Sequence, residues 1–464
     1  MKGGAAYGRN PILTANNPMI DSFDPNKTIS WMLLLDANNL YGFAMRQYLP
    51  YGNFKWIHNN NLTSDDIMKM GDEDDKGYFL EVDLEYPTNI HNLHDQYPLA
   101  PDHIKIDENM LSEFQKNLAK DLGTKSGGNK LGLTLYNKKN YICHYRNLKQ
   151  YLSLGMKLTK VHRVLEFSQS PWLRSYIDLN TELRQKANSK SEEELPKLMN
   201  NSFFGKTCED TKKYKDIQVF IGSDDKVIKS LQKVQNRPQF HRVKLYNDSF
   251  CAIQMIKQKV ILNKPRYVGM SVLALSKTIM YDFHYNFVLP NFPGTKLSFT
   301  DTDSFCYWIP HPTNIYDKLK ELDTDHKWMD FSNYPKDHPN YYDGNKLIPG
   351  KFKDETSGTP VIECISLRAK MYSMLVSDGS VKNTAKGVTR AVKRKYLTHD
   401  EYKKCLTNLK PKIDEMYRIM QKDHKLFTVK QIKNSLSPFN DKIWMCKEND
   451  EWFTHSLGHY NCNS

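Results

Sequence analysis

Three aspartates stand at positions where a carboxylate could take part in chemistry, and Asp36 is the first of them. It directly follows the apolar run 31–35, which is typical of a buried strand, so its charge lies where that strand leaves the core. Burying a carboxylate is costly unless a cation or hydrogen bonds compensate it, which makes Asp36 a candidate metal ligand. The plainer interpretation is a cap of a helix or turn that begins in the following Ala-Asn-Asn.

Asp301 and Asp303 form a pair of carboxylates farther along the chain. They lie between the short β-rich runs 297–300 and 305–309, which predicts a hairpin that presents both side chains at its tip. An ordinary polar turn would have a similar sequence, because Asp and Ser are favoured turn residues. Together with Asp36, the pair would supply three hard oxygen ligands, a set that suits two Mg²⁺ ions. We therefore expect all three aspartates to be catalytic and metal-binding.

A helix predicted between the two carboxylate sites has a polar face that suits a nucleotide. Lys197, Asn201 and Phe204 stand at helical spacing on one side, while apolar side chains lie around the other. That face would offer an ammonium group for phosphates, an amide, and a flat ring for a base. A plain amphipathic helix with a solvated lysine is the competing interpretation. We expect Pro196 to start or kink this helix and Gly205 to end it.

These segments resemble, in the same order, the motifs of family B DNA polymerases. The string from Asp36 to Gly42, D-A-N-N-L-Y-G, resembles their first polymerase motif, D-x-x-S-L-Y-P, with Asn and Gly in place of Ser and Pro. The string from Lys197 to Gly205 resembles K-x-x-x-N-S-x-Y-G, with Phe in place of Tyr. Asp301 begins a match to the D-T-D-S motif. The substitutions leave every expected metal ligand in place.

The resemblance implies roles for further residues around the nucleotide. Tyr41 would lie under the incoming sugar and exclude a 2′-hydroxyl, so that the enzyme selects deoxyribonucleotides. Arg184 and Lys186 would contact the triphosphate, although solvation of a surface explains this pair at least as well. The residues implied to bind the nucleotide are Tyr41, Lys197, Asn201, Phe204, Arg184 and Lys186.

The resemblance also implies a surface for DNA. Lys370 and Tyr372, in L-R-A-K-M-Y, match the family's K-x-Y motif, which holds the primer end near the metal ions. The densest basic stretch of the chain, 382–395, follows and is consistent with phosphate contacts along a duplex. A solvated face or a nuclear-import patch would have the same composition. The residues implied to bind DNA are Thr302, Ser304, Lys370, Tyr372, Lys386 and Gly387.

Long gaps between the motifs leave room for two insertions. The gap from Asp36 to the predicted helix spans 161 positions, and the gap after that helix spans 96. Two such insertions mark the protein-primed branch of the family, found in certain viruses, linear plasmids and Maverick or Polinton transposons, and the strings 155–167 and 281–285 resemble that group. The likeness implies that 48–154 contacts a terminal priming protein or upstream DNA and that 206–264 lies against the template. Because only 35 residues precede Asp36, we expect no proofreading exonuclease.

The mixed order of strands and helices predicts an α+β protein. Strand-like runs include 78–84, 243–245, 251–255 and 259–262, and helical periodicity is clearest over 271–287. The resemblance implies a right-hand polymerase fold with an antiparallel palm sheet, helical fingers and thumb, and two insertions. Its expected parts are a remnant N-terminal segment (1–30), the first part of the palm (31–47), a first insertion (48–154), helical fingers (155–205), a β-rich insertion (206–264), the second part of the palm (265–375) and a thumb-like region (376–464).

Composition limits the partners and the location. The 464 residues carry 66 Lys and Arg against 53 Asp and Glu, a net charge of +13, which favours a polyanion such as nucleic acid or an anionic membrane. No apolar run approaches the roughly 18 residues of a membrane span, so we expect none. Eight cysteines without a CxxC pair favour reduced thiols in the nucleus or cytoplasm. The spacing of Cys446, His455, His459 and Cys462 fits no standard zinc finger.

The expected function is template-dependent addition of deoxyribonucleotides to a primer 3′-hydroxyl, with two Mg²⁺ ions in each site. The partners would be primer–template DNA, deoxyribonucleoside triphosphates and a terminal priming protein. One rival is a catalytically silent DNA-binding remnant of a mobile element or virus, which would carry the same residues. Another is a reverse transcriptase, but that class would place two aspartates side by side in the hairpin.

Overall fold

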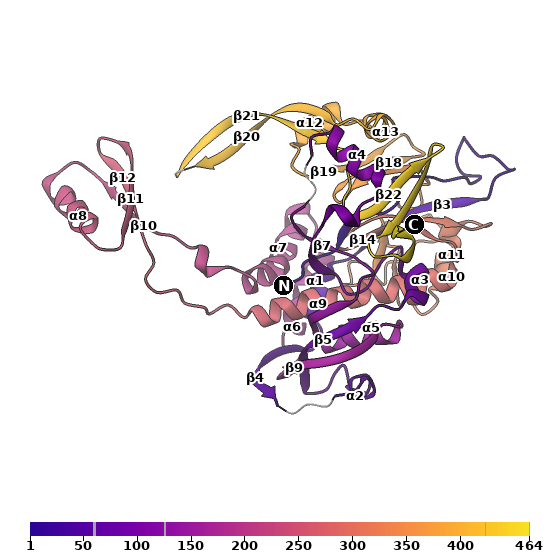
Figure 1. Cartoon of the computed structure of the whole chain (residues 1–464), viewed down its shortest axis with the longest axis horizontal. Helices are drawn as coiled ribbons and strands as arrows, with labels where there is room; N and C mark the ends of the chain where they lie inside the picture. The colour runs from indigo at the N-terminus through magenta and orange to yellow at the C-terminus, as the bar shows by residue number, and fades with distance from the viewer. Residues whose placement is uncertain (59–61, 125–126, 423, 464) are drawn as a thin grey trace.

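A six-stranded sheet forms the centre of the molecule (Figure 1). The computed structural model describes residues 1–58, 62–124, 127–422 and 424–463. Neighbouring strands of this central sheet are antiparallel, except the short edge pair β15 and β16, which is parallel. In spatial order the strands are β1 (Ala6–Gly8), β13 (Lys296–Asp301), β14 (Ser304–Pro310), β3 (Ser30–Ala37), β16 (Phe352–Asp354) and β15 (Met329–Asp330).

β3 is apolar along most of its length because both faces of the central sheet are covered. Leu33 and Leu35 belong to the main core, together with residues of α9 (Arg266–Asp282), whereas Met32 packs in a separate core against strands of a second sheet. A strand covered on both faces is apolar without alternation. The strand predicted at 31–35 and the hairpin predicted from 297–300 and 305–309 are therefore confirmed.

α9 is the long helix beneath the central sheet. It continues directly into η4 (Phe283–Val288), a stretch of π-helix, and then α10 (Leu289–Asn291), which confirms the helix expected over 271–287. Phe283 stacks on Phe352 of β16 with ring centroids 3.8 Å apart. The helix is thereby packed against the strand that neighbours β3.

A second sheet covers the other face of the central sheet, in the order β19 (Val381–Ala385), β18 (Met371–Val376), β17 (Val361–Arg368) and β2 (Ile12–Thr14). α12 (Arg390–Tyr396) and α13 (His399–Asn408) follow it in the chain, and α11 (Ile315–Leu322) follows β14. Residues 1–30, expected to be a remnant, supply β1 to one sheet and β2 to the other. This segment is part of both sheets because its backbone pairs with their strands.

The region of the first insertion forms a four-stranded sheet in the order β4 (Leu49–Ile57), β9 (Lys157–Ser170), β5 (Lys76–Glu85) and β8 (Lys138–His144). The run 157–170, expected among helical fingers, is thus a strand. Its Thr, Val and Phe residues favour strands, and it pairs with a neighbour on each side. The remaining elements of this region are α2 (Ser64–Lys69), η1 (Thr88–Ile90), α3 (His91–His94), β6 (Asp102–Lys105), η2 (Glu108–Met110), α4 (Glu113–Asp121), β7 (Asn129–Gly132) and α5 (Tyr145–Ser153).

Residues 206–264 contain a distal lobe that projects from the body (Figure 1). α8 (Asp225–Gln235) packs on a three-stranded sheet of β10 (Asp216–Ile221), β12 (Phe250–Met255) and β11 (Phe240–Asn247), around Val234, Ile253 and Met255; η3 (Thr211–Lys213) precedes them. The prediction of a strand at 259–262 is wrong. This run connects the lobe to α9, and its Ile261 and Leu262 are exposed, so no packing favours a strand there.

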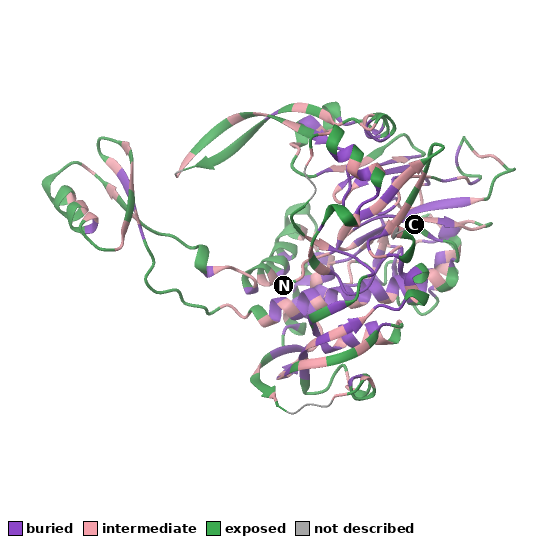
Figure 2. Cartoon of the chain, in the orientation of Figure 1, coloured by how far each residue is buried: buried purple, intermediate pink, exposed green. Residues whose placement is uncertain are grey.

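A long hairpin of β20 (Lys412–Lys422) and β21 (Lys425–Leu436), here called the arm, also projects from the body. At its tip, Lys425 Nζ lies 5.7 Å from the centroid of the Tyr246 ring in β11, so the arm reaches the distal lobe. Both projections are largely exposed, in contrast to the buried body (Figure 2). The chain then returns through β22 (Ile443–Glu448) and β23 (Glu451–Ser456), which pack beside α4, and ends in η5 (Tyr460–Asn463).

No helix among the described residues is long and apolar enough to cross a membrane. All eight cysteines carry free thiols, as the absence of CxxC pairs led us to expect.

Candidate active site

The structure brings Asp36 and Asp303 together. Asp36 lies near the end of β3 and is the register partner of Ser304 in β14. The backbone N–H of Ala37 donates to the carbonyl oxygen of Asp303 at 2.7 Å. Both carboxylates line one cavity of about 500 Å³, so side chains 267 positions apart share one site.

The turn between Asp301 and Asp303 is held in an uncommon backbone conformation. Thr302 has a φ of 75°, which is rare for a β-branched residue and indicates local strain. Its N–H donates to the carbonyl oxygen of Ala5 at 2.7 Å, and a Cβ added to Gly4 would collide with the Thr302 side chain. The segment leading into β1 therefore supports the turn that carries both aspartates.

The pKa values of both cavity carboxylates are raised. Burial, then repulsion from Asp303 and Glu355, raises the pKa of Asp36 to about 7. Burial raises the pKa of Asp303 to about 6, with a further contribution from Asp301. Burial and like charge both disfavour ionised carboxylates, and a bound cation would reverse both effects. The carboxylate oxygens of Asp36 and Asp303 are hard donors, which suit a divalent ion such as Mg²⁺.

Asp301 is placed differently from the other two aspartates. Its Oδ1 lies 2.5 Å from Lys370 Nζ, and it does not line the cavity. Nearby, the ring of Tyr372 stacks on Phe299 of β13 with centroids 3.7 Å apart. Lys370 and Tyr372, implied to hold a primer end, thus lie against the strand that ends in Asp301.

Other residues implied to bind DNA lie on the same side as Lys370. The N–H of Lys386 donates to the carbonyl oxygen of Lys370 at 3.0 Å, which brings the start of the basic stretch beside it. Gly387 has a φ of 83°, and its carbonyl oxygen accepts from Lys433 of the arm at 3.4 Å. Ser304 is buried beside Asp36, whereas Thr302 lines the cavity.

The nucleotide-facing helix is α7 (Lys190–Thr207), and Lys197, Asn201 and Phe204 all line the cavity. The expected start at Pro196 and end at Gly205 are wrong, because α7 contains both residues. The helix begins earlier because Ser189 caps it, with its side chain accepting from the N–H of Glu192 at 3.3 Å, and it runs through both residues.

Tyr41 lies in α1 (Leu40–Met45), directly after β3, and its ring stacks on Phe204 with centroids 4.3 Å apart and planes inclined by 25°. Both rings line the cavity. Burial, then the charge of Asp303, raises the pKa of the Tyr41 hydroxyl. Tyr41 from the first motif and Phe204 from the helix motif thus form one stacked aromatic pair in the wall of the cavity.

Of the two further bases implied for the triphosphate, only one reaches the cavity. Arg184, in α6 (Arg174–Gln185), is buried and lines the cavity, where it donates to Glu193 Oε1 at 3.0 Å. Lys186 caps the end of α6, 3.9 Å from Glu182, and does not line the cavity. The positions are two apart on a helix, which places their side chains on different faces.

Sequence reasoning missed the contribution of β16. Lys353 is the register partner of Asp36 on this strand and lines the cavity, and Glu355 follows just after the strand. Asn38 also lines the cavity and donates to Asp330 Oδ2 at 2.5 Å. A three-residue strand gives almost no periodic signal, although the alternation in K-F-K-D-E could have placed Lys353 and Glu355 on one face.

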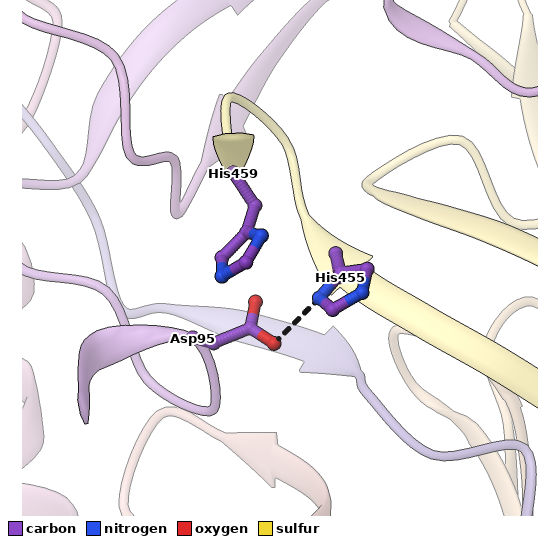
Figure 3. Close-up of side chains that lie close together, drawn as sticks. All are labelled: Asp95, His455 and His459. Atoms are coloured by element: carbon purple, nitrogen blue, oxygen red, sulfur yellow. Dashed lines mark hydrogen bonds and ion pairs between the residues drawn. The ribbon is translucent and has the colours of Figure 1, made fainter. Parts of the chain in front are cut away.

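A separate cluster joins Asp95, His455 and His459, whose ligand atoms lie within 4.8 Å of one another (Figure 3). The Asp95 carboxylate already accepts from His455 Nδ1 at 3.0 Å and from Arg9 at 2.6 Å. His459 Nε2 lies 3.0 Å from Asn92 Oδ1. Because the guanidinium group occupies the place of a cation, we interpret the cluster as an ion-pair network that joins β1, α3 and the C-terminal hairpin.

Comparisons with known proteins indicate the family to which this chain belongs. A family model described as DNA polymerase type B, organellar and viral, matches residues 25–290. The orthorhombic crystal form of phi29 DNA polymerase has 14% sequence identity and a TM-score of 0.50, over 94% of this chain and 61% of that chain. The phi29 DNA polymerase ternary complex with primer–template DNA and incoming nucleotides has 12% identity and a TM-score of 0.50, with the same coverage. No curated protein gives a significant match.

The likeness to these structures shows that the chain has the right-hand polymerase fold. The chain spans 61% of the length of both solved chains.

Proposed function

Because the chain belongs to the organellar and viral family of type B DNA polymerases, we propose that it adds deoxyribonucleotides to a primer 3′-hydroxyl under the direction of a template. One observation carries the proposal: Asp36, Asp303 and the polar face of α7 line the same cavity. A carboxylate pair next to an ammonium group and stacked rings is the combination that nucleotidyl transfer needs.

DNA polymerases of this family use divalent metal ions, which would supply charge stabilisation for the attacking oxygen and the leaving pyrophosphate when bound here. Asp36 and Asp303 would hold them, because both partly buried carboxylates line the cavity and a bound cation would offset the burial and like charge that raise their pKa values. Asp301 would assist from the edge of the site. Its contact with Lys370 keeps a positive charge beside the position proposed for the primer end.

The other wall of the cavity would bind the nucleotide. Lys197 would neutralise charge on the triphosphate, with Arg184 as a second cation that Glu193 orients. Tyr41, supported by Phe204, would lie under the sugar and exclude a 2′-hydroxyl. Asn201 would contribute an amide from the same face of α7.

DNA would lie on the side of Lys370, Tyr372 and Lys386. A terminal priming protein, proposed for this branch of the family, would contact the region 48–154. Both proposals rest on the family and on the position of these residues next to β13 and outside the central sheet.

Primer extension tests the function directly. Asp36→Asn removes one buried charge and keeps the shape of the side chain, so Mg²⁺-dependent extension should fall by about three orders of magnitude while DNA binding on a gel persists. Glu182→Gln, a change to an exposed carboxylate outside the cavity, serves as the control. DNA retardation by the unmodified protein without any extension would favour the silent remnant, and extension only on an RNA template would favour a reverse transcriptase.

A further inference from the structure

Lys353 is the one basic residue in the described lining of the cavity to which no motif drew attention. In the central sheet Asp36 has Ser304 of β14 as its register partner on one side and Lys353 of β16 on the other. Directly opposed residues of antiparallel strands have Cβ atoms about 5 Å apart and point to the same face. Lys353 and Asp36 therefore point to the same face, and Asp303, the residue before Ser304, lines the same cavity.

The contacts of Lys353 leave its charge available to the cavity. Its Nζ lies 2.6 Å from Glu355 Oε1, and the side chains of this pair are 28% and 31% exposed. Solvent reaches both side chains of this pair, so it partly screens their attraction. Among the described contacts of Lys353, the Glu355 carboxylate is the one ion-pair partner, so a stronger polyanion could draw the ammonium group away from it.

The charges around the cavity point to what Lys353 binds. The charged lining residues are three acidic and three basic: Asp36, Glu193, Asp303, Arg184, Lys197 and Lys353. Arg184 and Glu193 pair with each other. Cations bound by the two aspartates would leave Lys197 and Lys353 without negative partners inside the cavity. Two ammonium groups from different elements, beside a nucleotide-sized space, suit an oligophosphate.

We propose that Lys353 binds the triphosphate of the incoming nucleotide from the palm, as a partner to Lys197 on the fingers helix. The inference rests on the proposed function, since it takes the cavity to be the nucleotide site. It goes beyond that function by making the strand β16 part of the site. Lys353 would then set nucleotide affinity and would contribute little to the chemical step, because it contacts phosphate in the ground state and in the transition state alike.

Equilibrium binding separates this role from the activity. The protein is bound to a primer–template whose primer ends in a dideoxynucleotide, so that no bond can form, and the next nucleotide is titrated in Mg²⁺. Lys353→Ala should weaken binding of the matching deoxynucleoside triphosphate about tenfold, the scale of one charge-assisted hydrogen bond, and should leave binding of the corresponding deoxynucleoside unchanged. Lys353→Arg, which keeps the charge, should restore most of the affinity.

Lys318→Ala is the matched control. Lys318 is 29% exposed and pairs with Glu321 at 2.9 Å, but it lies in α11 and does not line the cavity. Its replacement should leave nucleotide binding unchanged. Lys353→Gln provides a second neutral variant that keeps the length of the side chain, in case truncation alters the fold, and melting temperatures report whether each variant is folded.

Three results would overturn the proposal. Equal triphosphate affinity in folded Lys353→Gln and unmodified protein would show that the ammonium group does not touch phosphate. An equal loss for triphosphate and deoxynucleoside would indicate a general change in the cavity. No triphosphate binding by the unmodified protein would remove the site itself. If the protein binds the triphosphate with the Lys353 dependence but fails to extend a primer, the proposed function fails and this inference stands.

Discussion

At the scale of single residues, the site depends on two carboxylates whose ionised forms are disfavoured by burial and by neighbouring negative charge. Asp36 and Asp303 are both largely buried, and each has a carboxylate neighbour that raises its pKa further. Asp301 forms an ion pair with Lys370 and lies outside the cavity. The three aspartates of the motifs are therefore chemically unequal, which their shared residue type does not reveal.

Proton competition should make metal binding depend on pH. With pKa values of about 7 and about 6, Asp36 is mostly protonated and Asp303 is half protonated in the metal-free protein at pH 6, and both are mostly ionised at pH 8. Mg²⁺ must displace those protons, so its affinity should rise with pH, on the order of tenfold over this interval. Calorimetric titration at both pH values measures the effect. Asp36→Asn should flatten the dependence, and equal affinities in the unmodified protein would contradict it.

Tyr41 offers a test of sugar selection. Tyr41→Ala would remove the ring that stacks on Phe204 and open space beneath the sugar. Discrimination against ribonucleotides should fall, on the order of tenfold or more, because the ring that sterically excludes the 2′-hydroxyl is no longer present. The measurement is the ratio of kcat/KM for dATP and ATP. Tyr51→Ala, on an exposed residue of β4, should leave the ratio unchanged, and the same ratio in Tyr41→Ala would rule out a gate.

At the scale of elements, the hairpin β13–β14 depends on a strand that comes from the start of the chain. β1 pairs along β13, and Ala5 accepts the N–H of the strained Thr302. The turn geometry is thus imposed from outside the hairpin. Strain of this kind persists only where surrounding structure determines it.

Gly4→Ala should shift the turn that carries Asp301 and Asp303, because the new methyl group would collide with the side chain of Thr302 between them. We expect a loss of stability of about 1–3 kcal/mol together with lower extension activity. Adding Thr302→Gly removes the collision and should restore much of the stability. Denaturant unfolding of both variants measures this. Gly3→Ala is the control, since a Cβ there meets no neighbour, and an equal loss in that variant would contradict the explanation.

Much of the fold could be predicted from sequence where the pattern was long or strongly apolar. β3, the hairpin of β13 and β14, and the helix over 271–287 were all evident, because their apolar residues are continuous or periodic. Short strands escaped prediction. β1 and β16 have three residues each, and tertiary pairing, which no local pattern records, makes them strands. Lys353 was missed for the same reason.

The same limits applied to the site. Spacing was enough to place Lys197, Asn201 and Phe204 on one cavity wall, because a helix fixes which positions share a face. It could not separate Arg184 from Lys186, since the helix end and the partner Glu193 decide which one turns inward. The run 259–262 shows the opposite error, where apolar content suggested a strand that has no packing surface.

At the scale of the whole molecule, histidines buried as neutral rings should make the fold sensitive to acid. Burial lowers the pKa of His94 to about 4 and those of His144 and His284 to about 3. The unfolded chain binds these protons below about pH 6.5, whereas the folded protein does not. Their contribution to stability is therefore complete above pH 6.5 and is lost as the pH falls toward 3 or 4.

Urea unfolding at pH 7.5, 6 and 5 measures this loss, expected to be on the order of 1 kcal/mol per pH unit for each histidine. His284→Gln removes one titrating ring and should make the loss less steep. His311→Gln, a change to a histidine outside the core, should not. A free energy of unfolding that stays constant between pH 7.5 and 5 would contradict the burial of neutral imidazoles.

The contact between Lys425 at the arm tip and Tyr246 of the distal lobe turns two separate projections into a closed circuit of polypeptide. A long polymer that entered this circuit could leave only by sliding out along its own axis or after the contact had parted. An exposed cation–π contact is worth only about 0.5–1 kcal/mol, little more than thermal energy. The circuit is therefore closed by one weak contact and not by a permanent link.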